Sequence, residues 1–226
     1  MNRAGTGQST AVVTYPKGSD PKEVEVWDIL VRTGHWSLVA LFSIAYLTGE
    51  IEVEVLHAWS GYAILAIVLL RIVWGFIGSK HARFRDFVFG WQETAAYAGS
   101  LLTLRPKHYL GHNPLGGWMV VGLLAMLLLV CWSGLELYAD EGKGPLAQAP
   151  LTLVPAAAAN GKDDEREDDG DSVWEDVHEA LASLGLLMVL LHVAGVLVAS
   201  LLHRENLVRA MVTGRKRVAD TPEEAR

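Results

Sequence analysis

The sequence predicts an all-α, integral membrane four-helix bundle, on three observations. Hydrophobic residues make up 51% of the 226-residue chain, and its mean hydropathy is positive, at +0.25. The apolar residues are concentrated in a few long runs, as is typical of membrane helices. About 20 helical residues cross the roughly 30 Å hydrocarbon layer, and four runs reach that length: Ile29–Thr48, Leu56–Ile77, Gly116–Tyr138 and His178–Leu202.

The chain before the first run is polar. Residues 1–26 contain no apolar stretch with a small-residue cleavage site, so we expect no removable signal peptide and a first span that is retained. We therefore divide the chain into an N-terminal tail (1–26), a transmembrane domain (27–212) and a C-terminal tail (213–226). Before the third run, Asn113 is a predicted N-cap and Pro114 a predicted first helical residue.

The connections between the runs differ in composition. Between the second and third runs, Ala82–Leu104 carries aromatic side chains among charges, which predicts an interfacial helix along the headgroups for part of it. Between the third and fourth runs, residues 139–176 include the Ala/Pro-rich Pro145–Asn160 and the charge run Asp163–Asp171. Neither has the hydrophobic periodicity needed to bury itself, so we expect an extended, mobile acidic loop.

Basic residues indicate the orientation, because Lys and Arg in short flanking segments are retained on the cytoplasmic side. The connection after the first run contains Glu50, Glu52 and Glu54 without any basic residue, and the segment from Glu136 to Asp176 has twelve acidic residues against three basic ones. We expect both to face the side opposite the cytoplasm, with both chain ends in the cytoplasm. Apart from Arg71 within the second run, the other basic residues lie in the remaining segments: Arg3, Lys17, Lys22, Arg32, Lys80, Arg83, Arg85, Arg105, Lys107, Arg204, Arg209, Arg215, Lys216, Arg217 and Arg226.

The motifs of soluble enzymes are missing from the sequence. It has no Walker loop, no Rossmann glycine pattern and no nucleophile motif, and we expect no nucleic-acid partner. The single cysteine, Cys131, lies within the third run and cannot form an intrachain disulfide. Chemistry must therefore come from other side chains within the apolar runs.

Four of the eight histidines lie within or at the edge of an apolar run, where an imidazole must find a partner. His35 lies early in the first run, on the predicted cytoplasmic side, and His57 opens the second run on the opposite side. His178 and His192 of the fourth run are fourteen residues apart, which is about 21 Å and almost four helical turns. They point to nearly the same side of one helix, His178 at the depth of His57 and His192 at that of His35.

These matched depths predict two bis-histidine sites, each able to hold a six-coordinate haem iron between facing helices. The sequence has no C-x-x-C-H motif, so a haem would be held by coordination alone. With both axial positions filled, such an iron exchanges electrons and does not readily bind a substrate. The alternative for each histidine taken singly is a hydrogen-bonded core residue.

Further residues accompany these histidines. Arg32 and Arg71 lie at predicted cytoplasmic ends, where each either binds a haem propionate or marks the membrane boundary by snorkelling. Four glycines either let a flat macrocycle approach the backbone or simply pack membrane helices: Gly34, Gly61, Gly185 and Gly195. We expect the other four histidines to be solvated or interfacial: His81, His108, His112 and His203.

The chain also carries a series of short motifs, in this order: Val26-Trp27-Asp28, Arg32-x-x-His35-Trp36, Leu56-His57-x-x-x-Gly61-Tyr62, Arg71-x-x-Trp74-Gly75, Ala82-Arg83-Phe84, Gly111-His112-Asn113-Pro114-Leu115-Gly116, His178-Glu179, His192 and His203-Arg204-Glu205-Asn206-Leu207. Together they resemble the bacterial cytochrome b561 family, which includes the cytochrome b subunits of nickel-iron hydrogenases. The resemblance runs from about Val24 to Lys216, and the insert Pro145–Asp171 is longer than the family's minimal connection.

The resemblance implies a four-helix di-haem b cytochrome that exchanges electrons with membrane quinone, and its ligands would be His35, His57, His178 and His192. The sequence thus predicts electron transfer between a periplasmic redox partner, a hydrogenase or a c-type cytochrome, and the quinone pool. The acidic loop either favours docking of a basic partner or is acidic because it is translocated and disordered. The chain would be an electron carrier or a quinone oxidoreductase subunit, a homodimer is compatible with it, and no motif encodes the direction of flow.

Two other classes of protein are alternatives. A metal or proton transporter would use the same histidines as a relay and would have further acidic residues within its spans, where only the boundary residues Asp28 and Glu136 occur. A cofactor-free membrane anchor of a periplasmic complex would leave four imidazoles without a purpose. A reduced-minus-oxidised visible spectrum distinguishes the three.

Overall fold

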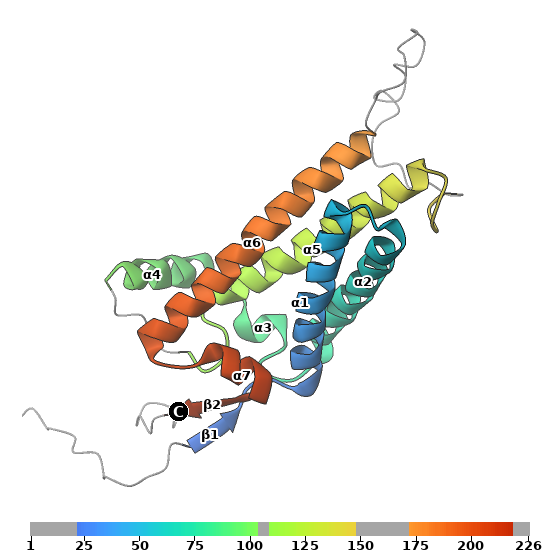
Figure 1. Ribbon diagram of the computed structural model, residues 1–226. Helices are drawn as coiled ribbons and strands as arrows, with labels where there is room; N and C mark the ends of the chain where they lie inside the picture. The colour runs from blue at the N-terminus through green and yellow to red at the C-terminus, as the bar shows by residue number, and fades with distance from the viewer. Residues whose placement is uncertain (1–21, 104–108, 148–171, 219–226) are drawn as a thin grey trace, which may run out of the picture.

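The computed structural model describes residues 22–103, 109–147 and 172–218, which form seven helices and two strands. Four helices are long and apolar enough to cross a membrane: α1 (Ile29–Glu50), α2 (Glu54–Ile77), α5 (Pro114–Asp140) and α6 (Val173–His203). They confirm the predicted all-α, multi-pass membrane bundle (Figure 1). Helices α5 and α6 each run a few residues into the segment 139–176 that the sequence analysis assigned to the loop.

Side-chain caps set where these helices begin. The Asp28 carboxylate accepts a hydrogen bond from the Val31 amide at 2.8 Å and starts α1. The Asn113 side chain accepts one from the Gly116 amide at 2.7 Å and starts α5, with Pro114 as its first residue, where a missing amide hydrogen is harmless. The predicted start of α5 is therefore confirmed.

The four long helices form two pairs. Helix α1 packs along α2, α5 packs along α6, and the pairs meet where α2 contacts α5 (Figure 1). The buried core at this meeting comprises Ile64 and Val68 of α2 and Leu124 of α5. Many large apolar side chains of these helices are exposed, as a lipid-facing surface requires.

The connection between α2 and α5 contains two short helices, α3 (Phe84–Phe87) and α4 (Trp91–Leu102). A helix within this segment is thus present as predicted. Thr94 and Tyr97 are buried, α4 contacts α5, and Trp91 at its start is 80% exposed. The placement of α4 along lipid headgroups stays a prediction.

Parts of the two tails pair with each other. Strand β1 (Lys22–Glu25) runs antiparallel to β2 (Arg215–Val218), and the short helix α7 (Leu207–Thr213) precedes β2. The Gly214 carbonyl, between α7 and β2, accepts a hydrogen bond from the Val26 amide at 2.9 Å. This pairing is not predicted from the sequence, because two four-residue charged strands carry too little alternation to be detected.

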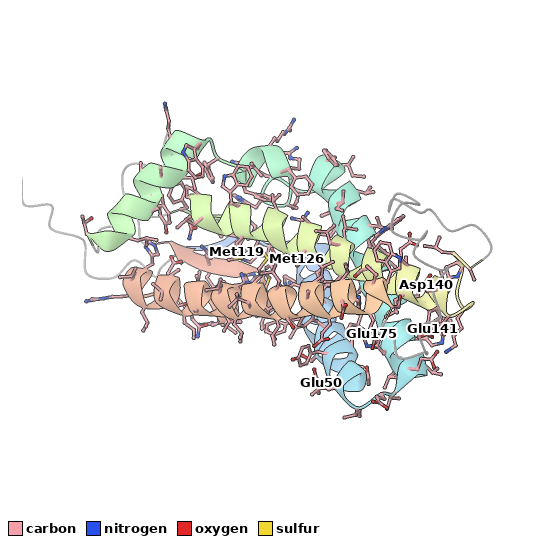
Figure 2. All side chains as sticks on the ribbon, turned by 90° about the horizontal axis from the view of Figure 1, so that it is seen from above. Glu50, Met119, Met126, Asp140, Glu141 and Glu175 are labelled. Carbon is pink, nitrogen blue, oxygen red and sulfur yellow. The ribbon has the colours of Figure 1, made fainter. Side chains whose placement is uncertain are left out.

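The bundle has two chemically different ends. We call the end that carries β1, β2 and α7 the sheet end, and the end that carries the α1–α2 connection the turn end. Figure 2 shows acidic side chains toward the turn end: Glu50, Asp140, Glu141 and Glu175.

The structure describes the acidic connection between α5 and α6 only where it joins each helix. Residues 148–171, with most of the Ala/Pro-rich run and all of the charge run that we predict to be mobile, lie outside the described residues. After α5, the Lys143 ammonium donates a hydrogen bond to the Glu54 carboxylate of α2 at 2.7 Å. Before α6, the Ser172 hydroxyl donates to the Asp140 carboxylate at 2.8 Å. These hydrogen bonds hold both ends of the connection at the turn end.

Candidate functional site

The four histidines within the long helices form two facing pairs. At the turn end, the ring centroids of His57 on α2 and His178 on α6 are 5.9 Å apart, with an interplanar angle of 83°. At the sheet end, the centroids of His35 on α1 and His192 on α6 are 6.3 Å apart, with an angle of 58°. The structure thus brings together the residues that helix depth and periodicity pair in the sequence.

Both pairs bridge helices whose backbones are apart. Among the described helices, α6 makes its extensive close contact with α5, and none of comparable extent with α1 or α2. The imidazoles of α1 and α2 therefore meet those of α6 where the helix backbones are not in close contact.

Hydrogen bonds orient both rings at the turn end. The His57 Nδ1–H donates to the Ala45 carbonyl of α1 at 2.8 Å. The His178 Nδ1 lies 2.9 Å from the Ser133 hydroxyl of α5, which itself donates to the Val130 carbonyl at 3.0 Å, so the serine oxygen accepts from the histidine. Each ring is thereby held with its lone pair on Nε2, the nitrogen that is then able to bind a metal.

Small residues make room for these rings. A Cβ atom on Gly134 of α5 would lie 2.9 Å from the His178 ring, and one on Gly49 of α1 would lie 3.3 Å from the His57 ring. Ser133, Gly134 and Gly49 were not predicted from the sequence. The Ser133-Gly134 pair, two small residues in a bulky span at the predicted depth of His178, was the signal that could have indicated them.

The four glycines singled out in the sequence have different surroundings. A Cβ atom on Gly61 or Gly195 would meet no atom within 4 Å among the described residues, so open space lies beside both. A Cβ on Gly185 would contact Met126 of α5 at 3.5 Å, which makes Gly185 a helix-packing residue. A Cβ on Gly34 would be in ordinary contact with Ile67, at 3.7 Å.

Two arginines at the sheet end have buried nitrogens without partners among the described residues. The Arg71 guanidinium lies 5.7 Å from the Phe84 ring centroid and 5.9 Å from that of Phe87, and its Nη1 is unpaired. Arg32 donates from Nη2 to the Val212 carbonyl of α7, and its Nε is unpaired. Both guanidinium groups are therefore suited to bind an anionic group.

His112, also at the sheet end, is half-buried, where the sequence predicts a solvated or interfacial residue. Its ring packs between those of Trp27 and Phe87, with centroid distances of 4.6 and 4.7 Å. Its Nδ1 atom is buried and has no partner in the described part of the chain. Burial, and then the nearby Arg71 guanidinium, lower the pKa of His112 to about 3, so the ring is neutral at pH 7.

The remaining histidines lie outside the two pairs. His81 is half-buried, and burial lowers its pKa below the usual value. His203 is the last residue of α6. His108 lies outside the described residues.

Comparison with known proteins identifies the family. The family described as prokaryotic cytochrome b561 matches residues 26–214, which is most of the chain. The chain belongs to this family. A protein of Rhizobium leguminosarum bv. viciae named "Probable Ni/Fe-hydrogenase B-type cytochrome subunit" is 22% identical to this cytochrome b561, covering 90% of it and 93% of the relative.

Two further relatives of this cytochrome b561 bear the same name. That of Bradyrhizobium diazoefficiens is 24% identical over 87% of each chain. That of Azotobacter chroococcum mcd 1 is 29% identical, over 75% of this chain and 69% of the relative. No solved structure matches this cytochrome b561. Family membership assigns it a membrane electron-transfer role with haem b.

The residues present fit haem b. A histidine nitrogen binds a metal at about 2 Å, so two imidazoles on opposite sides of one iron have ring centres about 6 Å apart. The centroid separations of 5.9 and 6.3 Å agree with this. Among the described residues, no three His, Cys, Asp or Glu side chains converge as a metal-ion site, so these imidazoles occur as pairs. Free Nε2 atoms, open space beside two glycines and unpaired arginine nitrogens suit a macrocycle with propionates.

Proposed function

We propose that this cytochrome b561 carries electrons across the membrane through two haems b, one held by His57 and His178, the other by His35 and His192. The observation that carries the proposal is the pairing of imidazoles at two levels along α6, with centroid separations of 5.9 and 6.3 Å. Each haem, when bound, would supply a one-electron couple, and an iron held by two histidines would have no position left for a substrate.

The chain's own residues would fix each haem and its surroundings. Helix α6 sets the distance between the two sites, about 21 Å along the helix for fourteen residues. Ser133 and the Ala45 carbonyl hold the turn-end rings in position. We assign Arg32 and Arg71, with their unpaired nitrogens, to the propionates of the sheet-end haem, because a carboxylate would satisfy buried guanidinium donors.

We further propose that the turn end faces the periplasm of a bacterial inner membrane and the sheet end faces the cytoplasm. The distribution of Lys and Arg supports this orientation. The names of the relatives support a hydrogenase as the periplasmic redox partner. Quinone within the membrane would be the electron-exchange partner at the other end.

The test is haem content in ligand variants of the full-length protein. The wild type, purified in detergent, should show a sharp b-type α-band and about two haems per chain by pyridine haemochrome. His57→Ala or His178→Ala should remove one haem, and His35→Ala or His192→Ala the other, so each single variant retains about half of the haem. His81→Ala, at a half-buried histidine outside both pairs, is the matched control and should retain both haems.

Two results would contradict the proposal. A folded protein without haem would favour the histidine-relay transporter or the cofactor-free anchor. Retention of spectrally identical haem in His57→Ala and His35→Ala would show that the histidines do not form two separate sites.

A further inference from the structure

The hydrogen bonds around the two histidine pairs are unequal. At the turn end both rings donate from Nδ1, His57 to the Ala45 carbonyl at 2.8 Å and His178 to the Ser133 hydroxyl at 2.9 Å. At the sheet end, the His35 Nδ1 is buried and has no hydrogen-bond partner among the described residues. The turn-end imidazoles are therefore supported by acceptors that the His35 ring does not have.

An acceptor for the Nδ1 hydrogen changes the chemistry of the other ring nitrogen. It increases the electron density of the imidazole and makes it a more basic ligand. A more basic axial ligand stabilises ferric iron more than ferrous iron, because ferric iron carries one more positive charge, and this lowers the midpoint potential. By this effect, the turn-end haem has the lower potential.

The charges at the two ends act in the same direction and are an independent observation. Figure 2 shows Glu50, Asp140 and Glu175 toward the turn end, and negative charge favours the ferric state. At the sheet end, the Arg71 guanidinium has a buried nitrogen without a partner among the described residues, and positive charge favours the ferrous state. Ligand basicity and local charge thus order the two potentials in the same way.

We propose that Ser133 is a positioning residue that, through His178, helps to hold the turn-end haem at a lower midpoint potential than the sheet-end haem. This inference rests on the proposed function, which places a haem at each pair. One electron that leaves ferrous iron at the turn end and reaches ferric iron at the sheet end oxidises the first and reduces the second, without any proton. Transfer between the two haems would be favourable in that direction.

The test is a spectroscopic redox titration of the full-length protein with both haems bound. His35→Ala retains only the turn-end haem and His57→Ala only the sheet-end haem, which assigns each wild-type potential to its site. We expect the turn-end potential to be the lower one. Ser133→Ala should raise it, because loss of an outer-shell partner typically weakens metal binding at least tenfold, and a tenfold loss of preference for ferric iron equals about 59 mV for one electron.

The matched control is Ser60→Ala. Ser60 is a buried serine of α2 whose hydroxyl donates to the Leu56 carbonyl, as that of Ser133 does to Val130, and no hydrogen bond joins it to either histidine pair in the described part of the chain. Ser60→Ala should leave both potentials unchanged. In Ser133→Ala, the electron paramagnetic resonance g-values of the turn-end ferric haem should change while those of the sheet-end haem stay constant.

Three results would overturn the inference. One is a sheet-end potential below the turn-end potential in the wild type, which decides the question even if Ser133→Ala fails to fold. The others are a turn-end potential unchanged by Ser133→Ala and an equal shift of both haems. Two haems in the wrong order would leave the proposed function standing, whereas the lack of haem would remove the proposed function itself.

Discussion

At the scale of single residues, Asp28 joins two helices through one carboxylate. Its Oδ1 accepts the α1 cap bond from the Val31 amide at 2.8 Å, and its Oδ2 accepts from the Trp74 indole at 3.0 Å and from the Ser79 hydroxyl. Burial alone would raise the pKa of Asp28, but the hydrogen bonds from Ser79, Trp74 and the backbone outweigh it and hold the pKa below its usual value. The ionised form is therefore favoured by folding.

Replacement of Asp28 tests this arrangement. Asp28→Ala should lower the free energy of unfolding by about 2 kcal/mol at neutral pH, because it removes a helix cap and two side-chain hydrogen bonds. The folded pKa lies below the unfolded value of about 3.9, so this stabilisation is complete above about pH 5 and is lost as the pH falls through the folded pKa. Unfolding in detergent at pH 8, 6, 5 and 3 measures it.

The control for this prediction is Asp86→Ala. Asp86 forms a partly exposed ion pair with Arg83 at 2.7 Å, and such pairs contribute about 1 kcal/mol or less. An advantage of the wild type over Asp28→Ala that grew as the pH fell below 5 would contradict the assignment, because it would require a raised pKa in the folded state.

At the scale of elements, α6 supplies one histidine to each pair and α5 supplies none. The spacing between the sites therefore follows from the rise of a single helix and does not depend on loops. Helix α5 contributes through small residues instead, because Ser133 and Gly134 let the His178 ring lie against it. An α5 span with bulky residues at these positions would displace the ring.

The turn between α7 and β2, at the sheet end, depends on Gly214. This residue has φ of 81°, in the left-handed region, and a Cβ there would lie 2.7 Å from the Trp27 carbonyl. Gly142 has φ of 72°, but a Cβ there would meet nothing within 4 Å among the described residues. Alanine variants at the two glycines therefore distinguish the free-energy cost of the left-handed backbone conformation from the cost of the steric clash.

Gly214→Ala should disrupt the pairing of β1 with β2, whereas Gly142→Ala should cost only about 1 kcal/mol for the left-handed conformation. The measurement is hydrogen exchange at the Val26 and Trp27 amides, which donate to the Gly214 carbonyl at 2.9 and 3.1 Å. Exchange at both amides should become faster in Gly214→Ala and stay unchanged in Gly142→Ala. Equal protection in the two variants would show that the tails do not depend on this turn.

At the scale of the whole molecule, charge divides the bundle into an acidic turn end and a sheet end where basic residues dominate. The acidic side chains that Figure 2 labels lie toward the turn end. Arg32, Arg71 and Lys216 lie at the sheet end, where burial lowers the pKa of Lys216. Because Lys and Arg are retained in the cytoplasm, this division predicts the orientation of the whole chain.

Cysteine labelling tests the orientation. In a Cys131→Ser background, Glu175→Cys at the turn end and Thr213→Cys at the sheet end each place one thiol at an exposed position. A membrane-impermeant maleimide added to intact spheroplasts should label the first and spare the second, and lysis should expose both. The reverse pattern would invert the proposed sides and, with them, the place of the periplasmic partner.

The sequence by itself determined the four spans, the start of α5 and the pairing of His35 with His192 and of His57 with His178. These follow from the length of apolar runs, from one capping motif and from the fixed rise of a helix in a layer of known thickness. All three are local or one-dimensional properties, so they can be derived before any contact between helices is known.

Only the tertiary structure decided what surrounds each ring. The acceptor for His178, the packing of His112 between two aromatic rings, the contact of Gly185 with α5 and the pairing of the two tails all join residues far apart in the chain. Their positions depend on the rotation and the close approach of whole helices, which periodicity within one helix leaves open. The sequence therefore indicates which histidines face one another, and the packing of α5 against α6 decides how differently the two pairs are held.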